Sequence, residues 1–316
     1  MPELRYHTCF IARGDRKVMD HLSDGRPRGA GEPFRIRMTH SLLMNARTSE
    51  LAVVAWCIVA AIVAMLRPLG ARGRWRVMGG AFGLALAAIA ATRLSDTGVA
   101  GMTRNLAPAV FVLCAYWLAG GYFVAPQPRL EQRLLSMDRR LLAPLRLERR
   151  LTAGRSWLLE ILEAAYFSVY VLLPLGAWAA WAHGGSTSVD TYWTMVFPSE
   201  ASCYIALAWV QTRPPRELEP WAAALRMRSL VRQANEAVLS RGSHHMNTIP
   251  SGHAAGAVAV ALAVWALQAP GTWFFGAVAV AICVATVVGR YHFVVDTVAG
   301  AAVAVSWWWV VTAAWR

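Results

Sequence analysis

The chain has 316 residues, of which 57% are hydrophobic, and its mean hydropathy is +0.39. A soluble domain of this length does not need so much apolar surface, so the composition predicts an all-α protein that crosses a membrane several times. The net charge of +13 comes from thirty arginines and one lysine, which lie in short stretches between apolar runs. Lipid headgroups or phosphate fit this pattern better than nucleic acid, which needs a continuous basic surface.

The chain divides into four segments of different composition. The first carries nine basic residues without a hydrophobic period, which predicts a disordered tail in which Met38 and Met44 are alternative starts. N-terminal transmembrane helices, an amphipathic segment and a C-terminal membrane domain follow it. In order, the four segments are residues 1–48, 49–126, 127–155 and 156–316.

Apolar runs of helical length recur along the chain. The shortest are marginal against the roughly 20 residues that cross the hydrocarbon layer, so the sequence predicts a helical bundle of seven or eight spans. Tryptophans such as Trp157 and Trp209 lie near the ends of the runs, as is typical of a membrane interface. The runs cover residues 51–66, 77–92, 106–124, 157–182, 194–210, 251–269, 272–288 and 292–313.

Residues 127–155 have a different pattern. Leu130, Leu134, Leu141 and Leu145 recur near a helical period, and eight arginines occupy much of the remainder. This pattern favours an amphipathic helix in the membrane interface, broken at Pro144. A basic connector without an interfacial role is the alternative.

The first candidate motif is Pro-Ser-Gly-His at residues 250–253, where an apolar run begins. Ser251 and Gly252 are placed to offer backbone N–H groups at the positive end of a helix, which is a seat for phosphate. Gly252 would let the phosphate approach closely, and His253 would protonate a leaving oxygen. The alternative is a helix cap with an incidental histidine.

The second motif lies at residues 291–296. His292 and Asp296 are four residues apart and share one helical face. Asp296 can hold the proton on one ring nitrogen and leave the other nitrogen free to attack phosphorus. Arg290 is expected at the mouth of the site, where it would hold phosphoryl oxygens. A structural His–Asp pair and an arginine that only reaches the interface are the alternatives.

Two arginines bracket a pair of prolines in the loop after the fifth run. Arg213 and Arg216 suit a phosphoryl transition state because negative charge grows on its equatorial oxygens; a charged surface turn is the alternative. His244, His245 and His253 have no acidic or cysteine partner at a usual ligand spacing, so we expect neither a metal nor a cofactor.

Glu160, Glu163 and Tyr166 follow one stripe of the fourth run. They are candidates to position an acceptor alcohol. Two alternatives remain open, in which they buttress the arginines or pair with Arg155 at the interface.

Alternate crossings of the membrane place the three motif loops on one face. The connections on that face hold eighteen basic residues and those on the other face hold three, which favours a cytoplasmic site in the cell membrane. The nine basic residues of the tail lie on the opposite face and argue against this orientation.

Arg-Pro at 213–214, Pro-Ser-Gly-His at 250–253 and His-x-x-x-Asp at 292–296 resemble the motifs of the type 2 phosphatidic acid phosphatase (PAP2) superfamily. The resemblance covers about residues 157–316. It implies a six-helix core and an enzyme that acts on lipid phosphates without a metal. The roles it implies are nucleophile for His292, acid for His253, orientation of the nucleophile for Asp296 and phosphate binding for Arg213.

The chain departs from the family pattern at two basic positions. Ala206 stands where the first motif usually begins with Lys, and Ala285 and Thr286 stand where the third motif usually has Ser-Arg. A threonine at this position, followed by a histidine between aromatic residues and then Val-Asp, resembles the inositol phosphorylceramide synthase branch. Members of that branch transfer phosphorylated headgroups between lipids. We therefore expect transfer from a membrane lipid to an alcohol or water. A simple lipid-phosphate phosphatase and a non-catalytic lipid-binding or transport protein are the alternatives.

Overall fold

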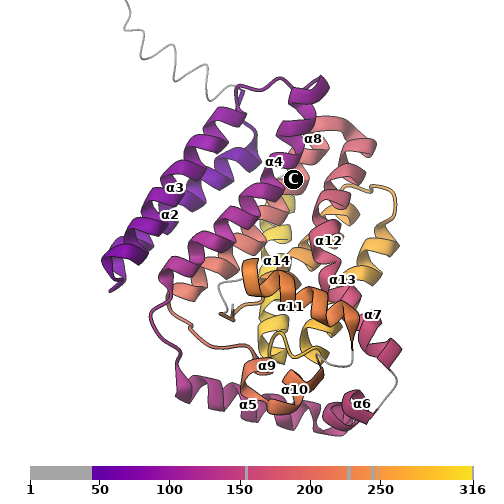
Figure 1. Ribbon diagram of the computed structural model, residues 1–316. Coiled ribbons are helices and arrows are strands. Elements are labelled where there is room, and N and C mark those ends of the chain that lie inside the picture. Colours follow the sequence, from indigo (N-terminus) through magenta and orange to yellow (C-terminus); the bar gives the residue numbers. More distant parts are fainter. Residues whose placement is uncertain (1–44, 154–155, 226–228, 243–245, 248, 315–316) are drawn as a thin grey trace, which may run out of the picture. The chain divides into compact units, whose positions relative to one another are not determined.

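The computed structural model describes residues 45–314 except 154–155, 226–228, 243–245 and 248. Over these ranges the fold is all helical, as predicted, and no strand is formed (Figure 1). An antiparallel bridge between Thr212 and Asn247 links two of its loops. Nearly all of the predicted tail, including Met38 and Met44, lies outside the described residues.

Along the described residues, the apolar helices come in three groups, which are separated by two groups of connecting helices. The apolar helices are α2 (Thr48–Leu66), α3 (Ala71–Ala91), α4 (Gly98–Ala119), α7 (Ser156–Phe167), α8 (Val169–Ile205), α12 (Gly252–Ala266), α13 (Thr272–Val288) and α14 (Val294–Ala314). The connecting helices are α5 (Pro128–Leu142), α6 (Leu147–Ala153), α9 (Pro215–Leu218), α10 (Pro220–Ala224) and α11 (Leu230–Gly242). Short 3-10 turns follow α4, α5 and α8.

Helix α8 is a hairpin of two antiparallel arms. Gly184 and Gly185 have non-helical backbone angles, and Gly185 has φ of +64°, which favours glycine. Tyr192 donates a hydrogen bond to the carbonyl of Leu173 at 2.8 Å. In a straight helix these residues would be about 28 Å apart, so the chain folds back at the glycine pair. The apolar run 157–182 covers α7 and the first arm, and the run 194–210 begins within the second arm.

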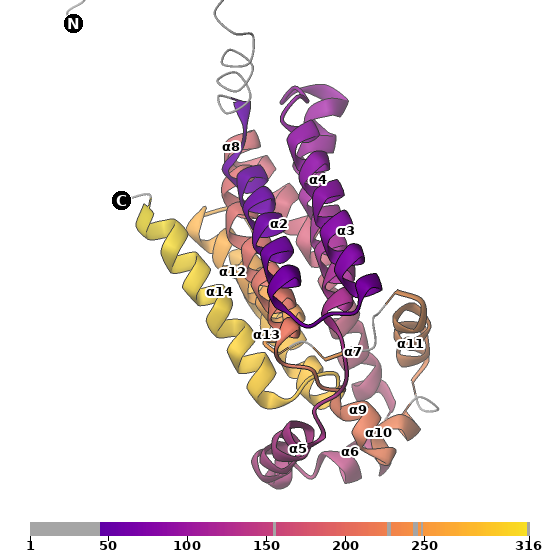
Figure 2. The same cartoon turned by 90° about the vertical axis from the view of Figure 1, so that its left-hand side faces the viewer.

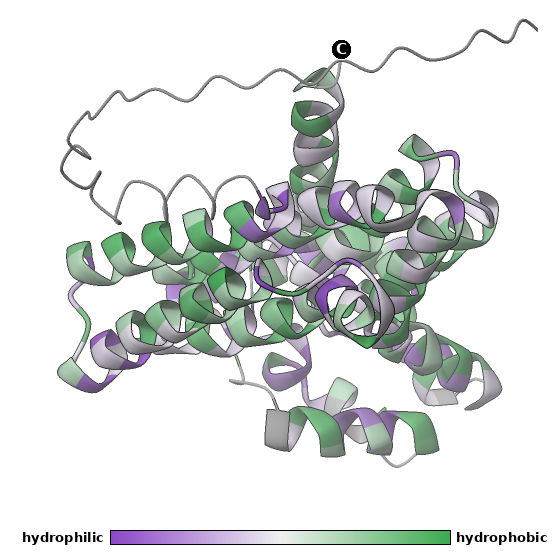
Figure 3. Cartoon of the chain, turned by 90° about the horizontal axis from the view of Figure 1, so that it is seen from above, coloured by the Kyte–Doolittle hydropathy of each residue, from purple (hydrophilic) through white to green (hydrophobic). Residues whose placement is uncertain are grey.

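The long helices have the character of membrane helices. By length and composition α2, α4 with its 3-10 turn, and α14 each suffice to cross a membrane, and the bent pair α7–α8 makes a fourth candidate. Helices α12 and α13 are apolar but shorter. Large apolar side chains such as Ile58, Leu86 and Val298 point outward, and green is the prevailing colour of the helices in Figure 3. The predicted seven or eight spans remain a prediction.

Helix α12 lies at the centre of the C-terminal bundle and packs against α8, α13 and α14. Helices α2, α3 and α4 form a second layer, which packs on α8 through α2 and α4 (Figures 1 and 2). Alanine and glycine dominate α12, which lets its neighbours come close. A Cβ on Gly300 of α14, for example, would overlap the carbonyl oxygen of Ser251.

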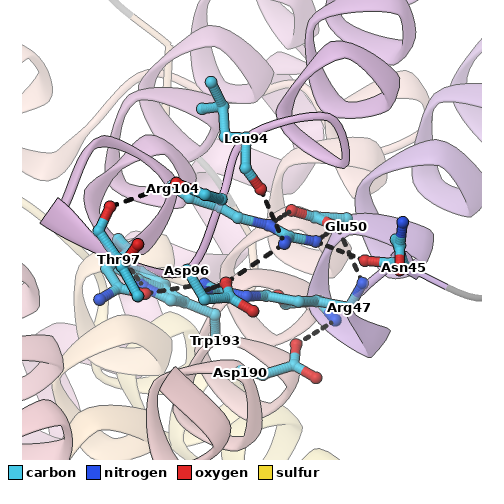
Figure 4. A network of polar contacts seen from close by, with 12 residues as sticks. Asn45, Arg47, Glu50, Leu94, Asp96, Thr97, Arg104, Asp190 and Trp193 are labelled. Carbon is cyan, nitrogen blue, oxygen red and sulfur yellow. Dashed lines mark hydrogen bonds and ion pairs between the residues drawn. The ribbon is translucent and has the colours of Figure 1, made fainter. Parts of the chain in front are cut away.

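A buried polar network joins α2, α4 and the second arm of α8 (Figure 4). Arg104 pairs with Glu50 through contacts of 2.7 and 2.9 Å, and both side chains are buried. Arg47 donates to Asn105 at 2.8 Å, and Asp190 accepts from the backbone N–H of Ser49 at 2.8 Å. The network lies near the turn of the α8 hairpin and fixes the N-terminal layer there.

Helix α5 packs one face on the bundle and leaves the other exposed. Glu131, Leu134 and Asp138 are buried, at steps of three and four residues, whereas Met137 and Leu141 are exposed. The 3-10 turn that ends the helix, Ala143–Leu145, contains the proline at which the sequence predicts a break.

Candidate active site

Three loops meet at one end of the C-terminal bundle and are joined by backbone hydrogen bonds. Asn247 N–H donates to the carbonyl of Thr212 at 2.8 Å, which joins the arginine loop to the segment before α12. Arg216 N–H donates to the carbonyl of Arg290 at 2.9 Å, which joins the arginine loop to the α13–α14 loop. The predicted convergence of the motifs is thus a feature of the fold.

The two predicted histidines face each other across this junction. The ring centroids of His253 and His292 are 6.1 Å apart. His292 Nδ1 lies 3.7 Å from Asp296 Oδ2, which is longer than a hydrogen bond. That oxygen accepts from Asn247 Nδ2 at 2.7 Å and from Phe293 N–H at 2.9 Å.

Unsatisfied polar atoms are concentrated at this junction. Within the described part of the chain, His253 Nε2, His292 Nδ1 and Asp296 Oδ1 are buried without a hydrogen-bond partner. Buried polar groups are normally paired, so each such atom calls for an explanation. Atoms poised to bind substrate or to exchange a proton provide one, because catalytic hydrogen bonds often tighten only when substrate is present.

Tyr166 holds the ring of His253 in place. Its ring stacks on His253 at 4.6 Å and on Tyr291 at 3.7 Å, with planes within 9° and 8° of parallel. The guanidinium of Arg216 lies over the ring of Tyr291, 4.9 Å from its centroid. These stacking contacts connect α7, α12 and two of the motif loops.

Glu163 is a buried support for this stack rather than part of the cavity lining. It accepts hydrogen bonds from Arg232 at 3.0 Å, from Asn235 at 2.8 Å and from the hydroxyl of Tyr291. Burial and the neighbouring Glu163 raise the pKa of Tyr291, so the phenol keeps its proton. Of the possibilities left open by the sequence, the geometry favours the buttressing of arginines.

Glu160 belongs to a different contact. Its carboxylate accepts from Leu230 N–H at 2.7 Å, from Val231 N–H at 3.0 Å and from the hydroxyl of Ser229 at 2.9 Å. These are free N–H groups at the start of α11, which an acidic side chain satisfies. Its alternative partner Arg155 lies outside the described residues.

Arg213 turns away from the histidines. Its backbone N–H and its guanidinium bind Glu131 of α5 at 2.8 to 3.1 Å, and Arg213 does not line the cavity described below. The hydrogen bonds from Arg213 lower the pKa of Glu131, although burial opposes the shift. Its role as a phosphate ligand remains a prediction that this geometry does not favour.

Arg290 also has other partners. It is buried with φ of +63°, and it pairs with Asp138 of α5 and, at 2.8 Å, with Glu219. Asp138 also accepts the first N–H of α14, from Val294, at 2.8 Å. Burial raises the pKa of Asp138 despite these contacts. Two carboxylates therefore engage the charge that the sequence assigned to phosphoryl oxygens.

The start of α12 differs from the phosphate seat that the sequence predicts. Ser251 is the N-cap of the helix, but its N–H donates to the carbonyl of Asp296 at 2.9 Å and its hydroxyl accepts from Ala254 N–H at 3.3 Å. The ring of Tyr204 fills the space that a Cβ on Gly252 would take. This glycine therefore serves the packing of α12 against α8, which explains its place without a ligand.

A cavity of about 370 Å³ opens beside the histidines. His253, His292 and Arg216 line its polar end, and apolar side chains of α4, α8 and α11 form most of its walls. The cavity therefore combines a polar end beside the histidines with mostly apolar walls. Residues that line the walls are Val110, Leu113, Tyr116, Tyr170, Leu173, Glu200, Tyr204, Val238 and Leu239.

Glu200 is not among the site residues predicted from the sequence. Its place inside an apolar run could have identified it as a candidate functional residue. The acidic partners of the arginines, Glu131 and Asp138, were also not predicted. Their spacing of seven residues with Leu134 between them placed them on one helical face. Nothing in the local pattern identified Arg232. In the described ranges, no three His, Cys, Asp or Glu side chains are grouped to hold a metal ion.

Comparisons with known proteins give one match. A sequence model of the PAP2 superfamily matches residues 132–310, which is more than half of the chain and includes all three motif loops. No curated protein and no solved structure matched the chain. Helices α2, α3 and α4 precede the matched residues. The chain belongs to the PAP2 superfamily.

Proposed function

We propose that the protein is a membrane enzyme that transfers a phosphoryl group or a phosphorylated headgroup from a lipid to an alcohol or to water. The observation that carries the proposal is the pair of histidines, 6.1 Å apart, at the polar end of an apolar cavity. The gap between the rings suits a phosphorus atom that is attacked from one side and loses its leaving oxygen on the other.

The reaction proceeds in two balanced steps. A ring nitrogen of His292 attacks phosphorus, the bond from phosphorus to the lipid oxygen breaks, and His253 gives its proton to that oxygen. In the second step His253 takes a proton from the acceptor hydroxyl. The acceptor oxygen then attacks phosphorus, and the P–N bond to His292 breaks.

Asp296 and Arg216 assist these steps. Asp296, whose Oδ2 lies 3.7 Å from His292 Nδ1, can accept a hydrogen bond from the Nδ1–H of His292, which leaves Nε2 as the attacking atom. Arg216 lines the polar end of the cavity, where its guanidinium can hold the phosphoryl oxygens as their charge grows. Of the two loop arginines that the sequence predicts at the phosphate, Arg216 is the one we retain in this role.

Transfer to an alcohol is favoured over simple hydrolysis by the character of the site. Thr286, where many relatives have a basic residue, is buried between α13 and α14, with its hydroxyl 3.1 Å from that of Thr297. This position supplies no cation, which suits a phosphodiester with one negative charge better than a phosphomonoester with its higher charge. Together with the resemblance of the third motif, this supports our proposal of an enzyme like the inositol phosphorylceramide synthase branch.

The membrane arrangement is part of the proposal. The six-helix core comprises α4, α7 with the first arm of α8, the second arm of α8, and α12 to α14. With α2 and α3 the proposed arrangement has eight spans, and the excess of basic residues in the connections on the face of the motif loops supports a cytoplasmic active site. A reporter enzyme fused into the loop between α11 and α12 tests this orientation, since activity only on the outer side of the membrane contradicts it.

The experiment that tests the activity uses purified protein in detergent and lipids labelled on phosphate. Phosphatidic acid and phosphatidylinositol are supplied with and without ceramide, or a diacylglycerol whose acyl chains are shorter than those of the donor, as acceptors. We expect label to move to the added alcohol and an acid-labile, base-stable label to appear on the protein, as for a phosphohistidine. Release of free phosphate alone, unaffected by alcohols, would instead establish a lipid-phosphate phosphatase.

Two histidine variants complete this experiment. His292→Ala is expected to lower turnover by at least about a thousandfold and to abolish the protein-bound label. His183→Ala is the matched control, because His183 is exposed near the hairpin turn of α8. If the two variants retained equal activity, or if His292→Ala preserved the cellular role of the protein, a non-catalytic lipid-binding function would replace the proposal.

A further inference from the structure

Glu200 is an acidic residue among apolar side chains, where burying a polar group costs free energy. It lies on the second arm of α8, its side chain is buried, and it lines the apolar cavity. Its Oε2 accepts a hydrogen bond from Tyr204 at 2.5 Å. Its Oε1 has no hydrogen-bond partner among the residues that the structure describes. An unpaired acceptor of this kind is costly, and a ligand that donates a hydrogen bond to it explains why it is kept.

The position of Glu200 relative to the catalytic histidine is fixed by α12. Oε1 lies against Gly256, where a Cβ would overlap it. Gly256 is three residues after His253, which corresponds to about 4.5 Å along the helix axis. The carboxylate therefore lies about one turn deeper in the cavity than the group that protonates the leaving oxygen.

The surroundings of Glu200 limit what it can bind. Tyr204 already donates to one oxygen, and the ring of Tyr116 packs edge-on against Tyr204 at 5.5 Å. The other walls at this depth are apolar, with Leu113 and Leu173 among them. A neutral hydrogen-bond donor satisfies Oε1 without bringing another charge into the cavity.

We infer that Glu200 recognises a hydroxyl or amide N–H on the lipid substrate, close to its phosphoester. This inference rests on the proposed function and narrows its substrate class. At about 1.5 Å per bond, the depth of Glu200 corresponds to a donor on about the second or third atom from the phosphoester oxygen. Lipids with an amide or a free hydroxyl at that position fit, whereas lipids with only esters or hydrocarbon there leave Oε1 unpaired.

The test measures binding, so that it does not depend on turnover. Two matched pairs of phosphate monoesters, each with one octanoyl chain, are titrated into the His292→Ala variant purified in detergent. The first pair is 1-octanoylglycerol 3-phosphate and its 2-deoxy analogue. The second is octanamidoethyl phosphate and octanoyloxyethyl phosphate, which differ only by N–H in place of oxygen. We expect the donor-bearing member of at least one pair to bind about tenfold more tightly.

Variants at and beside Glu200 show whether this residue causes the preference. Glu200→Leu is expected to abolish it, and Gly256→Ala should weaken it by displacing the carboxylate while leaving Glu200 in place. Ser199→Ala is the matched control, because the Ser199 hydroxyl donates at 2.7 Å to a carbonyl of its own helix. That variant should keep the preference of the wild-type cavity.

The outcomes separate the inference from the proposed function. Equal affinities within both pairs, or a preference that survives in Glu200→Leu, overturn the role of Glu200. If the leucine variant does not fold, Glu200→Gln replaces it in the test. The amide has the size of the carboxyl group but is a weaker hydrogen-bond acceptor, so this variant should show a reduced preference. Absence of His292-dependent turnover overturns the proposed function instead, and the binding preference is measured independently of it.

Discussion

The arginines near the motif loops have different partners. Arg213, Arg232 and Arg290 are engaged by carboxylates of Glu131, Glu163 and Asp138, whereas Arg216 lines the cavity beside the histidines. Sequence motifs predicted where arginines gather but not which of them stays available. That choice depends on acidic partners far along the chain, and Asp138 is 152 residues from Arg290.

The two arginines of one loop can be separated by their effect on turnover. Arg216→Ala is expected to lower kcat/KM by about a hundredfold or more, because it removes a cation from the developing charge. Arg213→Ala should lower it less than about tenfold, because its guanidinium binds α5. Steady-state kinetics on the labelled lipid measure both, and equal losses would contradict the assignment of phosphate binding to Arg216.

At the scale of elements, α5 holds two of the motif loops. Glu131 binds the loop of Arg213, and Asp138 binds Arg290 and the first turn of α14. The leucine period and the proline predicted the helix and its end because both signals are local. The contacts of Glu131 and Asp138 with the motif loops were not predicted. Arginines dominate the composition of this segment, and the two buried acids are a minority in it.

The pH dependence of the free energy of unfolding tests whether the contact between Glu131 and Arg213 stabilises the fold. Arg213 lowers the pKa of Glu131 below its ordinary value of 4.5, so the carboxylate stabilises the folded state. This contribution is complete above about pH 4.5 and decreases as the pH falls through the pKa of the folded state. Thermal unfolding in detergent should therefore show a steeper loss of stability in acid for wild type than for Glu131→Gln.

Glu148→Gln is the matched control for this experiment, because Glu148 is exposed on α6. Its unfolding curve should follow that of the wild type at every pH. Parallel curves for wild type and Glu131→Gln would show that the contact with Arg213 does not contribute to folding. Hydrogen exchange at the amides of α5 locates the change, since it should be confined to this helix and the two loops.

At the scale of the whole molecule, the cavity crosses the boundary between two layers. The family match begins at residue 132, yet Val110, Leu113 and Tyr116 of α4 line the cavity. The apolar periodicity predicted the helices of both layers. It did not predict that α4 completes the cavity, because the pattern of an apolar helix does not distinguish a face toward lipid from a face toward substrate.

Acyl-chain selectivity should therefore depend on α4. Leu113→Trp places a larger ring in the cavity, so we expect turnover of a substrate with sixteen-carbon chains to fall about tenfold relative to one with eight-carbon chains. Leu86→Trp is the matched control, because Leu86 is an exposed leucine of α3 outside the cavity. A competition assay with both substrates gives the ratio, and an unchanged ratio in Leu113→Trp would contradict the role of α4.

The α8 hairpin has a consequence for the biosynthesis of the protein. Ribosomes deliver the chain from its N-terminus, so α4 and both arms of α8 leave the ribosome before His253 and His292 do. Most of the residues that line the cavity are therefore synthesised before either histidine. A chain arrested after residue 250 would lack α12, α13 and α14, and with them both histidines and the central helix on which α8 packs.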